Sequence, residues 1–245
     1  MRRIDTDQHM TNLLSNEELE ALRRINTPTI ANAIETFNLR PRNQGFMSPE
    51  VRCALPELVP ELGALVGYAV TARIMAEQPA AGGRRASRFD YWDYVLTGPE
   101  PRVAVIQDLD RPPAVGSFWG EVNANIHRAL GCAGVITDGG VRDLDEVRAL
   151  GFHMFAAHVI VSHAYIHLVD FGGPVKVGGL LVQPGDLLHA DQHGAVVIPH
   201  EVAREVATAA AMVDAAERRV IDYCKSADFS VERLKALVRE MGGAK

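Results

Sequence analysis

The chain has 245 residues, 47% hydrophobic and 23% charged, a composition that is ordinary for a globular enzyme or binding protein with one large domain or two small ones. Its formal net charge of −6 disfavours a nucleic-acid-binding surface, which is usually basic. Its three cysteines show no CxxC spacing, which argues against a cysteine zinc site and against a disulfide framework.

The first part of the chain is predicted to hold two helices and a strand. Ser15 and Glu18 have the capping-box spacing of a helix start, and Pro28 is tolerated in a first helical turn. The residues before Ser15 contain no apolar run typical of a secretory signal, so we expect a cytoplasmic protein. The expected helices span residues 15–25 and 27–37, and a run rich in β-branched residues predicts a strand over residues 65–75.

The central part of the chain alternates predicted strands and helices, which indicates α/β layering around a sheet. A glycine- and arginine-rich stretch over residues 80–88 is expected to be a mobile loop. Val122, Ile126 and Ala129 share one side of a predicted helix and are expected to face the core. The elements expected here are a helix over residues 89–98, a strand over 102–110, a helix over 117–132, a strand over 134–138 and a helix over 143–150.

The remaining third is predicted to be β-hairpins followed by helices. Residues 150–169 carry no full charge, but four histidines among them make a membrane span a poor interpretation. Gly, Pro and Asp punctuate residues 173–199, which predicts hairpin strands. An amphipathic helix over about 199–224 and a terminal helix over 230–242 follow. Because no interdomain linker is evident, we predict a single domain over residues 1–245.

The stretch 138-DGGVRDLDE-146 contains the first candidate for chemistry, the adjacent pair Arg142 and Asp143. Asp143 and Glu146 have capping-box spacing, so the local pattern fits an ordinary helix start. The pair also follows an apolar strand and a Gly-Gly turn, which is where ligands collect in open α/β sheets. A guanidinium matches a carboxylate in bidentate geometry, and an aspartate is a hard oxygen ligand for Mg²⁺ or Mn²⁺. The local sequence alone favours the helix start, whereas the position of the pair at a strand end keeps a ligand site open.

Glu121 lies upstream of this pair, at the start of a predicted helix. The backbone N–H groups of Val122, Asn123 and Ala124 are candidates for binding an anion, because the first amides of a helix have no partner within it. Glu121 itself also fits an ordinary first-turn acid, which the helix dipole favours.

Histidines form a rival constellation for metal binding. His163 and His167 have the i, i+4 spacing of a zinc-binding pair on a helix, and 189-HADQHG-194 adds His189, Asp191 and His193. The surrounding residues do not show a helical pattern, however, and the chain has no HExxH motif. We therefore do not predict a metal site there.

Twenty residues separate Glu121 from Arg142, and this acid-x20-Arg-Asp pattern resembles a known family. It is similar to the divalent-metal-dependent 4-hydroxy-4-methyl-2-oxoglutarate / 4-carboxy-4-hydroxy-2-oxoadipate aldolases, which share a fold with the regulator of ribonuclease E activity A and are called RraA-like. The family has Asp where this chain has Glu121, a departure that keeps the charge and adds one methylene. The stretches that carry the resemblance are 27-TPTIANAI-34, 67-GYAVTAR-73, 119-WGEVNANI-126, 134-GVITDGGVRDLDEV-147 and 184-PGDLLHADQHGAVVIP-199.

The resemblance implies a fold and a set of site residues. The fold would be a layered α/β sandwich of the swivelling phosphohistidine-domain kind, with an RraA-like core over about residues 27–225 and flanking N- and C-terminal helices. Asp143 matches the direct metal ligand, and Arg142 matches the arginine that binds a pyruvate-like substrate. Glu121 matches the acid that holds a metal-bound water, and Glu217 is the best match for an acid supplied by a neighbouring subunit's C-terminal helix.

The same resemblance implies an activity and its partners. The amides of Val122, Asn123 and Ala124 match the turn that receives the substrate carboxylate. We expect a class II pyruvate aldolase that uses Mg²⁺ or Mn²⁺, cleaves 4-hydroxy-2-oxo acids to pyruvate plus a carbonyl product, and decarboxylates oxaloacetate as a side activity. The expected assembly is a homotrimer or homohexamer with a 2-oxo acid as small-molecule substrate and with no nucleic-acid or membrane partner. The alternative is a non-catalytic regulator that binds ribonuclease E or another protein; no nucleotide-cofactor motif supports a third label of the family, a methyltransferase of menaquinone precursors.

Overall fold

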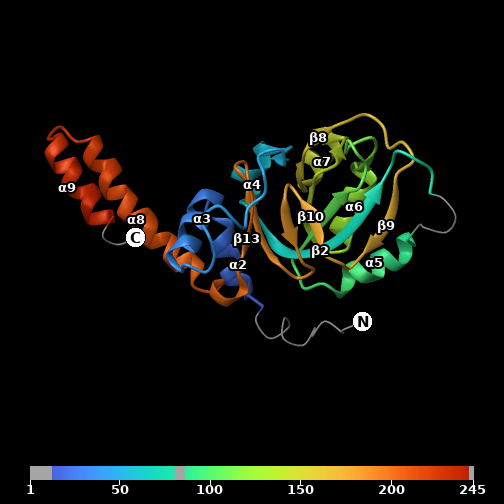
Figure 1. Cartoon of the computed structure of the whole chain (residues 1–245), viewed down its shortest axis with the longest axis horizontal. Coiled ribbons are helices and arrows are strands. Elements are labelled where there is room, and N and C mark those ends of the chain that lie inside the picture. The colour runs from blue at the N-terminus through green and yellow to red at the C-terminus, as the bar shows by residue number, and fades with distance from the viewer. Residues whose placement is uncertain (1–12, 81–85, 243–245) are drawn as a thin grey trace.

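A computed structural model describes residues 13–80 and 86–242, and Figure 1 shows a sheet-containing body from which two C-terminal helices extend as an arm. The helices are α2 (Asn16–Arg23), α3 (Thr27–Thr36), α4 (Val59–Leu62), α5 (Arg88–Thr97), α6 (Glu121–Ala129), α7 (Leu144–Leu150), α8 (Val206–Cys224) and α9 (Val231–Gly242), with short 3-10 turns at Pro56–Leu58 and His200–Val202. The strands are β1 (Arg52–Cys53), β2 (Leu65–Met75), β3 (Arg102–Asp108), β4 (Ser117–Trp119), β5 (Cys132–Thr137), β6 (Gly140–Val141), β7 (His153–Ala156), β8 (His158–Val159), β9 (His167–Phe171), β10 (Val175–Val177), β11 (Leu180–Val182), β12 (Leu187–Asp191) and β13 (Gly194–Ile198).

The main sheet has the strand order β1-β7-β5-β3-β2-β12-β13, with β9 also paired to β2. Its central strands β2, β3, β5 and β7 are parallel, whereas β12 and β9 run antiparallel to β2. Parallel strands end at a common edge, so the segments that follow β3 and β5 emerge side by side. Ligand sites of α/β proteins collect at such an edge.

A second, smaller sheet lies beyond that edge and consists of the parallel strands β4, β6 and β8. Strand β4 leads through Gly120 into α6, and strand β6 leads directly into Arg142. The pairing of β4 with β6 therefore brings two segments together that are far apart in the sequence. The register between them is irregular, because Ser117 pairs with Gly140 and Trp119 pairs with Val141, which leaves Phe118 as an extra residue.

The two faces of the main sheet are covered differently, which follows from the alternation of side chains along its strands. Helices α5, α6 and α7 pack on one face, where Tyr91, Trp119 and Phe152 are fully buried. The β10–β11 hairpin covers the other face through Val175, Val177 and Val182. A third apolar cluster joins α2, α3 and the start of α8 to β2, β12 and β13. The structure is thus a layered α/β protein with flanking helices at both ends of the described chain.

Most elements expected from the sequence are present. The strand over residues 65–75 is β2, and Ser15 and Glu18 form both hydrogen bonds of the expected capping box. The hairpins expected over residues 173–199 are β10–β11 and β12–β13. No helix among the described residues combines the length and apolar character that crossing a membrane requires. The loop expected over residues 80–88 lies partly outside the described residues, which omit 81–85.

The helix expected over residues 117–132 is wrong at its start and in its buried face. Residues 117–119 form β4, and α6 begins only at Glu121, after an extended Gly120. Val122 is 72% exposed and Ala129 is also exposed, whereas Ala124 and His127 make the buried face. The apolar spacing was therefore a poor guide here, because a buried histidine takes the place of an aliphatic residue.

Candidate functional site

Asp143 stands at the N-terminus of α7 but does not cap that helix. Its backbone is left-handed, with φ 57° and ψ 45°, and its side chain makes no capping hydrogen bond. The carboxylate instead accepts a hydrogen bond from the Glu121 N–H at 2.9 Å, across to the first residue of α6. The capping-box interpretation of Asp143 and Glu146 is therefore wrong. A left-handed aspartate is uncommon, and such strain clusters at functional sites.

Gly120 makes room for this contact. A Cβ atom at position 120 would lie 2.3 Å from Asp143 Oδ2, far inside ordinary contact distance, and 3.2 Å from Arg142 Cγ, which is a tight contact. The backbone at Gly120 is extended, with φ −162°, so the requirement for glycine here is one of space and not of backbone conformation. The negative carboxylate consequently lies directly on the N-terminus of α6, where the helix dipole stabilises negative charge.

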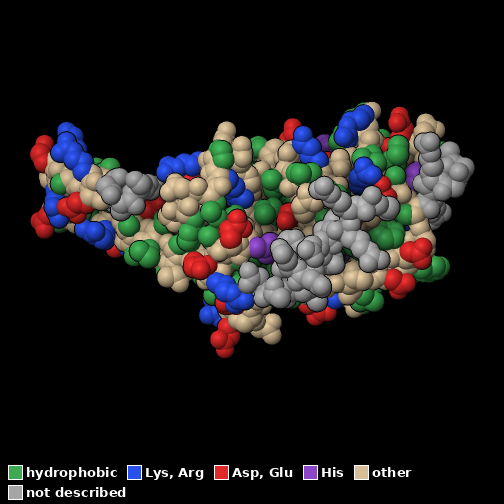
Figure 2. All heavy atoms as spheres, turned by 60° about the horizontal axis from the view of Figure 1, so that its bottom comes forward, with side chains coloured by type: hydrophobic (Ala, Val, Ile, Leu, Met, Phe, Trp, Pro, Cys, Tyr) green, Lys and Arg blue, Asp and Glu red, His purple; other side chains and the backbone are tan. Residues whose placement is uncertain are grey.

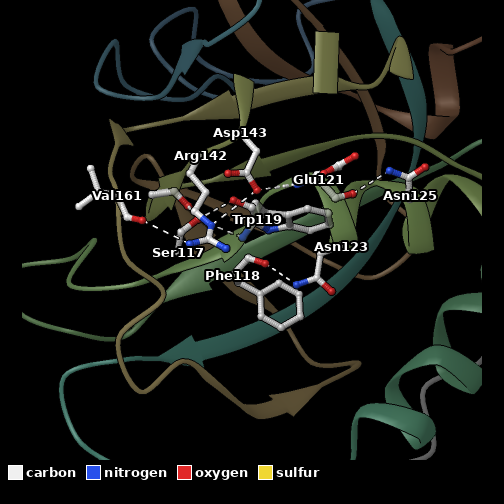
Figure 3. Close-up of polar contacts among 10 residues, drawn as sticks. Ser117, Phe118, Trp119, Glu121, Asn123, Asn125, Arg142, Asp143 and Val161 are labelled. Atoms are coloured by element: carbon white, nitrogen blue, oxygen red, sulfur yellow. Dashed lines mark hydrogen bonds and ion pairs between the residues drawn. The ribbon is translucent and has the colours of Figure 1, made fainter. Parts of the chain in front are cut away.

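Arg142 lies beside the same carboxylate. Its Nε is 3.6 Å from Asp143 Oδ2, and its Nη1 donates to the Val161 carbonyl at 3.3 Å. Its backbone N–H donates to Trp119 O at 3.1 Å, which fixes the residue against β4. In Figure 3 the guanidinium lies below the Asp143 carboxylate, and a dashed line joins that carboxylate to Glu121 at the start of α6. Both side chains are about one-third exposed, so the remaining guanidinium hydrogens are accessible to a ligand.

The first turn of α6 provides two open amides and not the three that were expected. The Ala124 N–H donates to the Gly120 carbonyl at 2.9 Å as part of the helix, so the expectation for Ala124 is wrong. The Glu121 N–H is taken by Asp143. The amides of Val122 and Asn123 have no acceptor in their own helix, and Gly120 has no side chain to cap them. Free amides at a helix start can bind an anion, and these two, called the cradle below, directly follow the Glu121 N–H that Asp143 takes.

Glu121 contributes its backbone to the site more directly than its side chain. The residue is exposed, and its carbonyl accepts from Asn125 Nδ2 at 2.9 Å. In Figure 3 its carboxylate points away from the Arg142 guanidinium. No group of three or more His, Cys, Asp or Glu side chains among the described residues has the arrangement of a complete metal site. A single chain therefore brings Asp143 and Glu121 together at the start of α6. The Asp143 carboxylate lies beside Arg142, and the Glu121 carboxylate points away from Arg142.

Glu217 lies on α8, in the arm, while α6 and α7 lie in the body of the molecule (Figure 1). Its Oε1 accepts from Asn32 Nδ2 at 3.4 Å, so within its own chain it belongs to the contact between α8 and α3. The expected role of Glu217 at a neighbouring subunit's site stays a prediction.

Three aspartates at the ends of β3 and β5 were not singled out from the sequence. Asp138 Oδ1 accepts from the Asp108 N–H at 2.7 Å, and Asp110 Oδ2 accepts from the amides of Ala76 and Glu77. Burial, together with the negative charge of Asp108, raises the pKa of Asp138 to about 6. These carboxylates hold the loops at the strand ends. The signal that could have found them is their position directly after two apolar strand runs.

A buried hydrogen-bond chain supports α6 from below. Tyr91 Oη lies 3.0 Å from His127 Nε2, and His127 Nδ1 lies 2.7 Å from the Asn123 carbonyl. Burial lowers the pKa of His127 to about 4, so the imidazole is neutral near pH 7, donates from Nδ1 and accepts from the tyrosine. This series of hydrogen bonds links Tyr91 of α5 to Asn123, whose amide is part of the cradle.

The rival histidines do not form a metal centre. His163 lies in a loop and His167 begins β9, so their i, i+4 spacing does not place them on a helix. Each has its Nδ1 within 3.0 Å of a backbone carbonyl, of Ala164 and of Tyr165 respectively. His189 is buried between Thr27 and the Leu22 carbonyl. Their contacts are those of structural histidines.

Comparison with known proteins gives a family match over most of the chain. The model of the RraA-like family, described as Aldolase/RraA, matches residues 27–197. A Halalkalibacterium halodurans protein named "Putative 4-hydroxy-4-methyl-2-oxoglutarate aldolase" is 32% identical over 81 residues, which is 33% of this chain and 39% of that protein. The chain spans about half or less of the length of the curated relatives that it matches.

Solved structures share the fold over nearly the whole chain. An uncharacterized protein from Pseudomonas syringae pv. tomato matches with a TM-score of 0.68 at 24% identity, covering 91% of this chain and 94% of that one. Streptomyces coelicolor RraAS2, titled an unusual member of the RNase ES inhibitor RraA protein family, matches with a TM-score of 0.62 at 25% identity, covering 84% and 97%. The layered α/β architecture expected from the sequence is confirmed by these matches.

Proposed function

The chain belongs to the RraA-like family, and on that basis we propose that it is a metal-dependent lyase, a class II pyruvate aldolase that cleaves 4-hydroxy-2-oxo acids to pyruvate and a carbonyl product. One observation carries the proposal. The Asp143 carboxylate leaves its own helix and lies on the start of α6, next to the Arg142 guanidinium and the open amides of Val122 and Asn123. At an ordinary helix start the Asp143 side chain would cap α7 and would not reach α6.

The donor chemistry of the site fits Mg²⁺ or Mn²⁺. Asp143 Oδ2 is engaged by the Glu121 N–H and lies near Arg142, while no hydrogen bond or ion pair involves Oδ1 among the described residues. Mg²⁺ usually keeps several waters and binds through one or two carboxylates plus the substrate, so a complete protein cage is not required. Asp143 would hold the cation directly and Glu121 through a water. Glu217 of a neighbouring subunit is the proposed further acid, which makes a homotrimer or homohexamer the proposed assembly.

The residues of this chain then have separate tasks. The amides of Val122 and Asn123 bind the 1-carboxylate of the 2-oxo acid, and the Arg142 guanidinium binds the oxygen on which negative charge develops. A bound divalent cation supplies Lewis-acid stabilisation of that charge, which is worth several kcal/mol. The exposed Glu121 carboxylate would exchange protons through solvent.

The reaction balances without an outside reagent. The C4 hydroxyl loses its proton and becomes a carbonyl as the C3–C4 bond breaks, and the electron pair of that bond moves to C3 as an enolate. A proton added at C3 then gives pyruvate. Loss of CO₂ from oxaloacetate leaves the same enolate, so oxaloacetate decarboxylation is the proposed side activity.

The test is release of pyruvate from 4-hydroxy-4-methyl-2-oxoglutarate and from oxaloacetate with Mg²⁺ or Mn²⁺, before and after EDTA. Asp143→Asn and Arg142→Ala should each abolish turnover. Asp145→Asn is the matched control, because Asp145 is on the same helix, is 88% exposed and pairs with Arg148. Undiminished turnover in EDTA or in the Asp143→Asn protein would refute the proposal.

A second candidate is a regulator that binds ribonuclease E or another protein. It is favoured by the likeness to Streptomyces coelicolor RraAS2, whose title names it as a member of an RNase ES inhibitor family. One experiment that measures both ribonuclease E inhibition and pyruvate release distinguishes the regulator from the aldolase. Inhibition of ribonuclease E that is equal for the wild-type and Asp143→Asn proteins, without pyruvate release by either, would support the regulator.

A further inference from the structure

We propose that Ser117 is a positioning residue that sets the spacing between the two halves of the candidate site; this inference rests on the proposed function. Ser117 lies in β4 and is 3% exposed, and its hydroxyl hydrogen bonds among the described residues go to backbone atoms and not to the Arg142 or Asp143 side chains. It was not a candidate from the sequence.

The Ser117 hydroxyl contacts both strands that lead into the site. Its Oγ lies 2.6 Å from Trp119 O and 2.7 Å from Gly140 O, and it accepts from the Trp119 N–H at 3.1 Å. Trp119 stands two residues before Glu121, and Gly140 stands two residues before Arg142. One hydroxyl thus joins the segment that carries the amide cradle to the segment that carries the guanidinium and the carboxylate (Figure 3).

The reason why a hydroxyl is needed there lies in the β4–β6 register. Phe118 is an extra residue in β4, and such a bulge interrupts the regular ladder and leaves backbone groups without their usual partners. The Ser117 hydroxyl satisfies groups on either side of the bulge, and Asn123 Nδ2 donates to the Phe118 carbonyl itself. The bulge is therefore tied both to β6 and to the first turn of α6.

The bulge sets the contacts that define the site. It lets Trp119 O accept the Arg142 N–H at 3.1 Å; two residues after Trp119, the Glu121 N–H reaches the carboxylate of Asp143, the residue that follows Arg142. Without the hydroxyl, the Gly140 carbonyl and the Trp119 N–H lose a buried partner, and the strands must shift to satisfy them. Because the site is formed between these two segments, the shift changes the distance between its halves.

The test compares Ser117→Thr with Ser117→Val. Both replacements have nearly the same shape, so packing strain from the added methyl is common to both and the difference reports the hydroxyl. We expect amide hydrogen exchange at Arg142 and Glu121 to be about tenfold faster or more in Ser117→Val than in Ser117→Thr, since buried hydrogen bonds limit local opening. Equal exchange at these two amides in the two variants overturns the inference.

Turnover separates this inference from the proposed function. If the wild-type protein releases pyruvate, Ser117→Val should lower kcat/KM by about tenfold or more relative to Ser117→Thr, because small displacements of site groups cost orders of magnitude in rate. In an Arg142→Lys background the two variants should differ much less, because that background already lacks the guanidinium whose distance from the amides the hydroxyl sets; a merely structural serine would give the same ratio in both backgrounds, which contradicts the inference. If the wild-type protein releases no pyruvate, the proposed function has failed, and the exchange measurement still decides whether Ser117 sets the geometry.

Discussion

Gly120→Ala should disrupt the candidate site although it replaces none of the residues that carry its functional groups. The added Cβ would lie 2.3 Å from Asp143 Oδ2, so the carboxylate must retreat by about 1 Å to reach an ordinary carbon–oxygen contact. That movement breaks the 2.9 Å hydrogen bond from the Glu121 N–H. Since a displacement of roughly 1 Å at an active site costs about a hundredfold in rate, we expect kcat/KM for pyruvate release to fall by about that factor.

Hydrogen exchange at the Glu121 amide gives a readout that needs no activity, because this amide should lose its protection in Gly120→Ala. Gly173→Ala is the matched control, since a Cβ there meets nothing within 4 Å. The thermal unfolding midpoint should change little in either variant, because Asp143 is about one-third exposed and water can replace the lost bond. Wild-type protection of Glu121 together with wild-type turnover in Gly120→Ala would refute the steric reasoning.

Three further predictions concern the surroundings of the site. Arg142→Lys keeps the charge but cannot present donors both beside Asp143 and to the Val161 carbonyl, so kcat/KM should fall at an unchanged unfolding midpoint; equal kinetics would contradict this role. Tyr91→Phe leaves buried His127 Nε2 without its donor and should lower the free energy of unfolding by about 1–3 kcal/mol in urea titrations, whereas Tyr165→Phe, at an exposed tyrosine, should not. Burial lowers the pKa of His127 and of His153 to about 4 from 6.5, so both take up protons on unfolding and stability falls as pH drops from about 6.5 towards 4. Burial also lowers the pKa of His189, which adds to this loss, whereas the raised pKa values of Asp138, about 6, and of Asp108 oppose it because the folded state binds those protons first. With three histidines against two aspartates, the free energy of unfolding in urea titrations should be lower near pH 5 than near pH 7, and a rise would contradict the assignments.

The elements that could be predicted from sequence are those specified by their own residues. The β-branched run of β2 and the Ser15 capping box are local signals, and both were identified with correct positions. The Arg142–Asp143 pair was placed correctly at a strand end, because the turn that precedes it is local as well. The contacts that decide between a helix start and a ligand site are not local. The direction of the Asp143 carboxylate depends on Gly120, more than twenty residues away in the chain.

The residues that sequence reasoning missed depend on pairing between distant segments. Ser117 reads as the start of an amphipathic helix until β4 is paired with β6, and only that pairing gives its hydroxyl three backbone contacts. His127 does not look like a core residue by hydropathy, yet its bond to Tyr91 makes it one. In each case a polar side chain is buried because a partner from another element satisfies it, which apolar periodicity cannot predict.

The most direct measurement of the central claim is a titration of the protein with Mn²⁺, followed by paramagnetic broadening of backbone amide signals. If Asp143 and Glu121 hold the cation, broadening should centre on the amides of Val122, Asn123 and Asp143 and should disappear in Asp143→Asn but not in Asp145→Asn. Broadening centred on His163 and His167, or a pattern that Asp143→Asn leaves unchanged, would contradict the account.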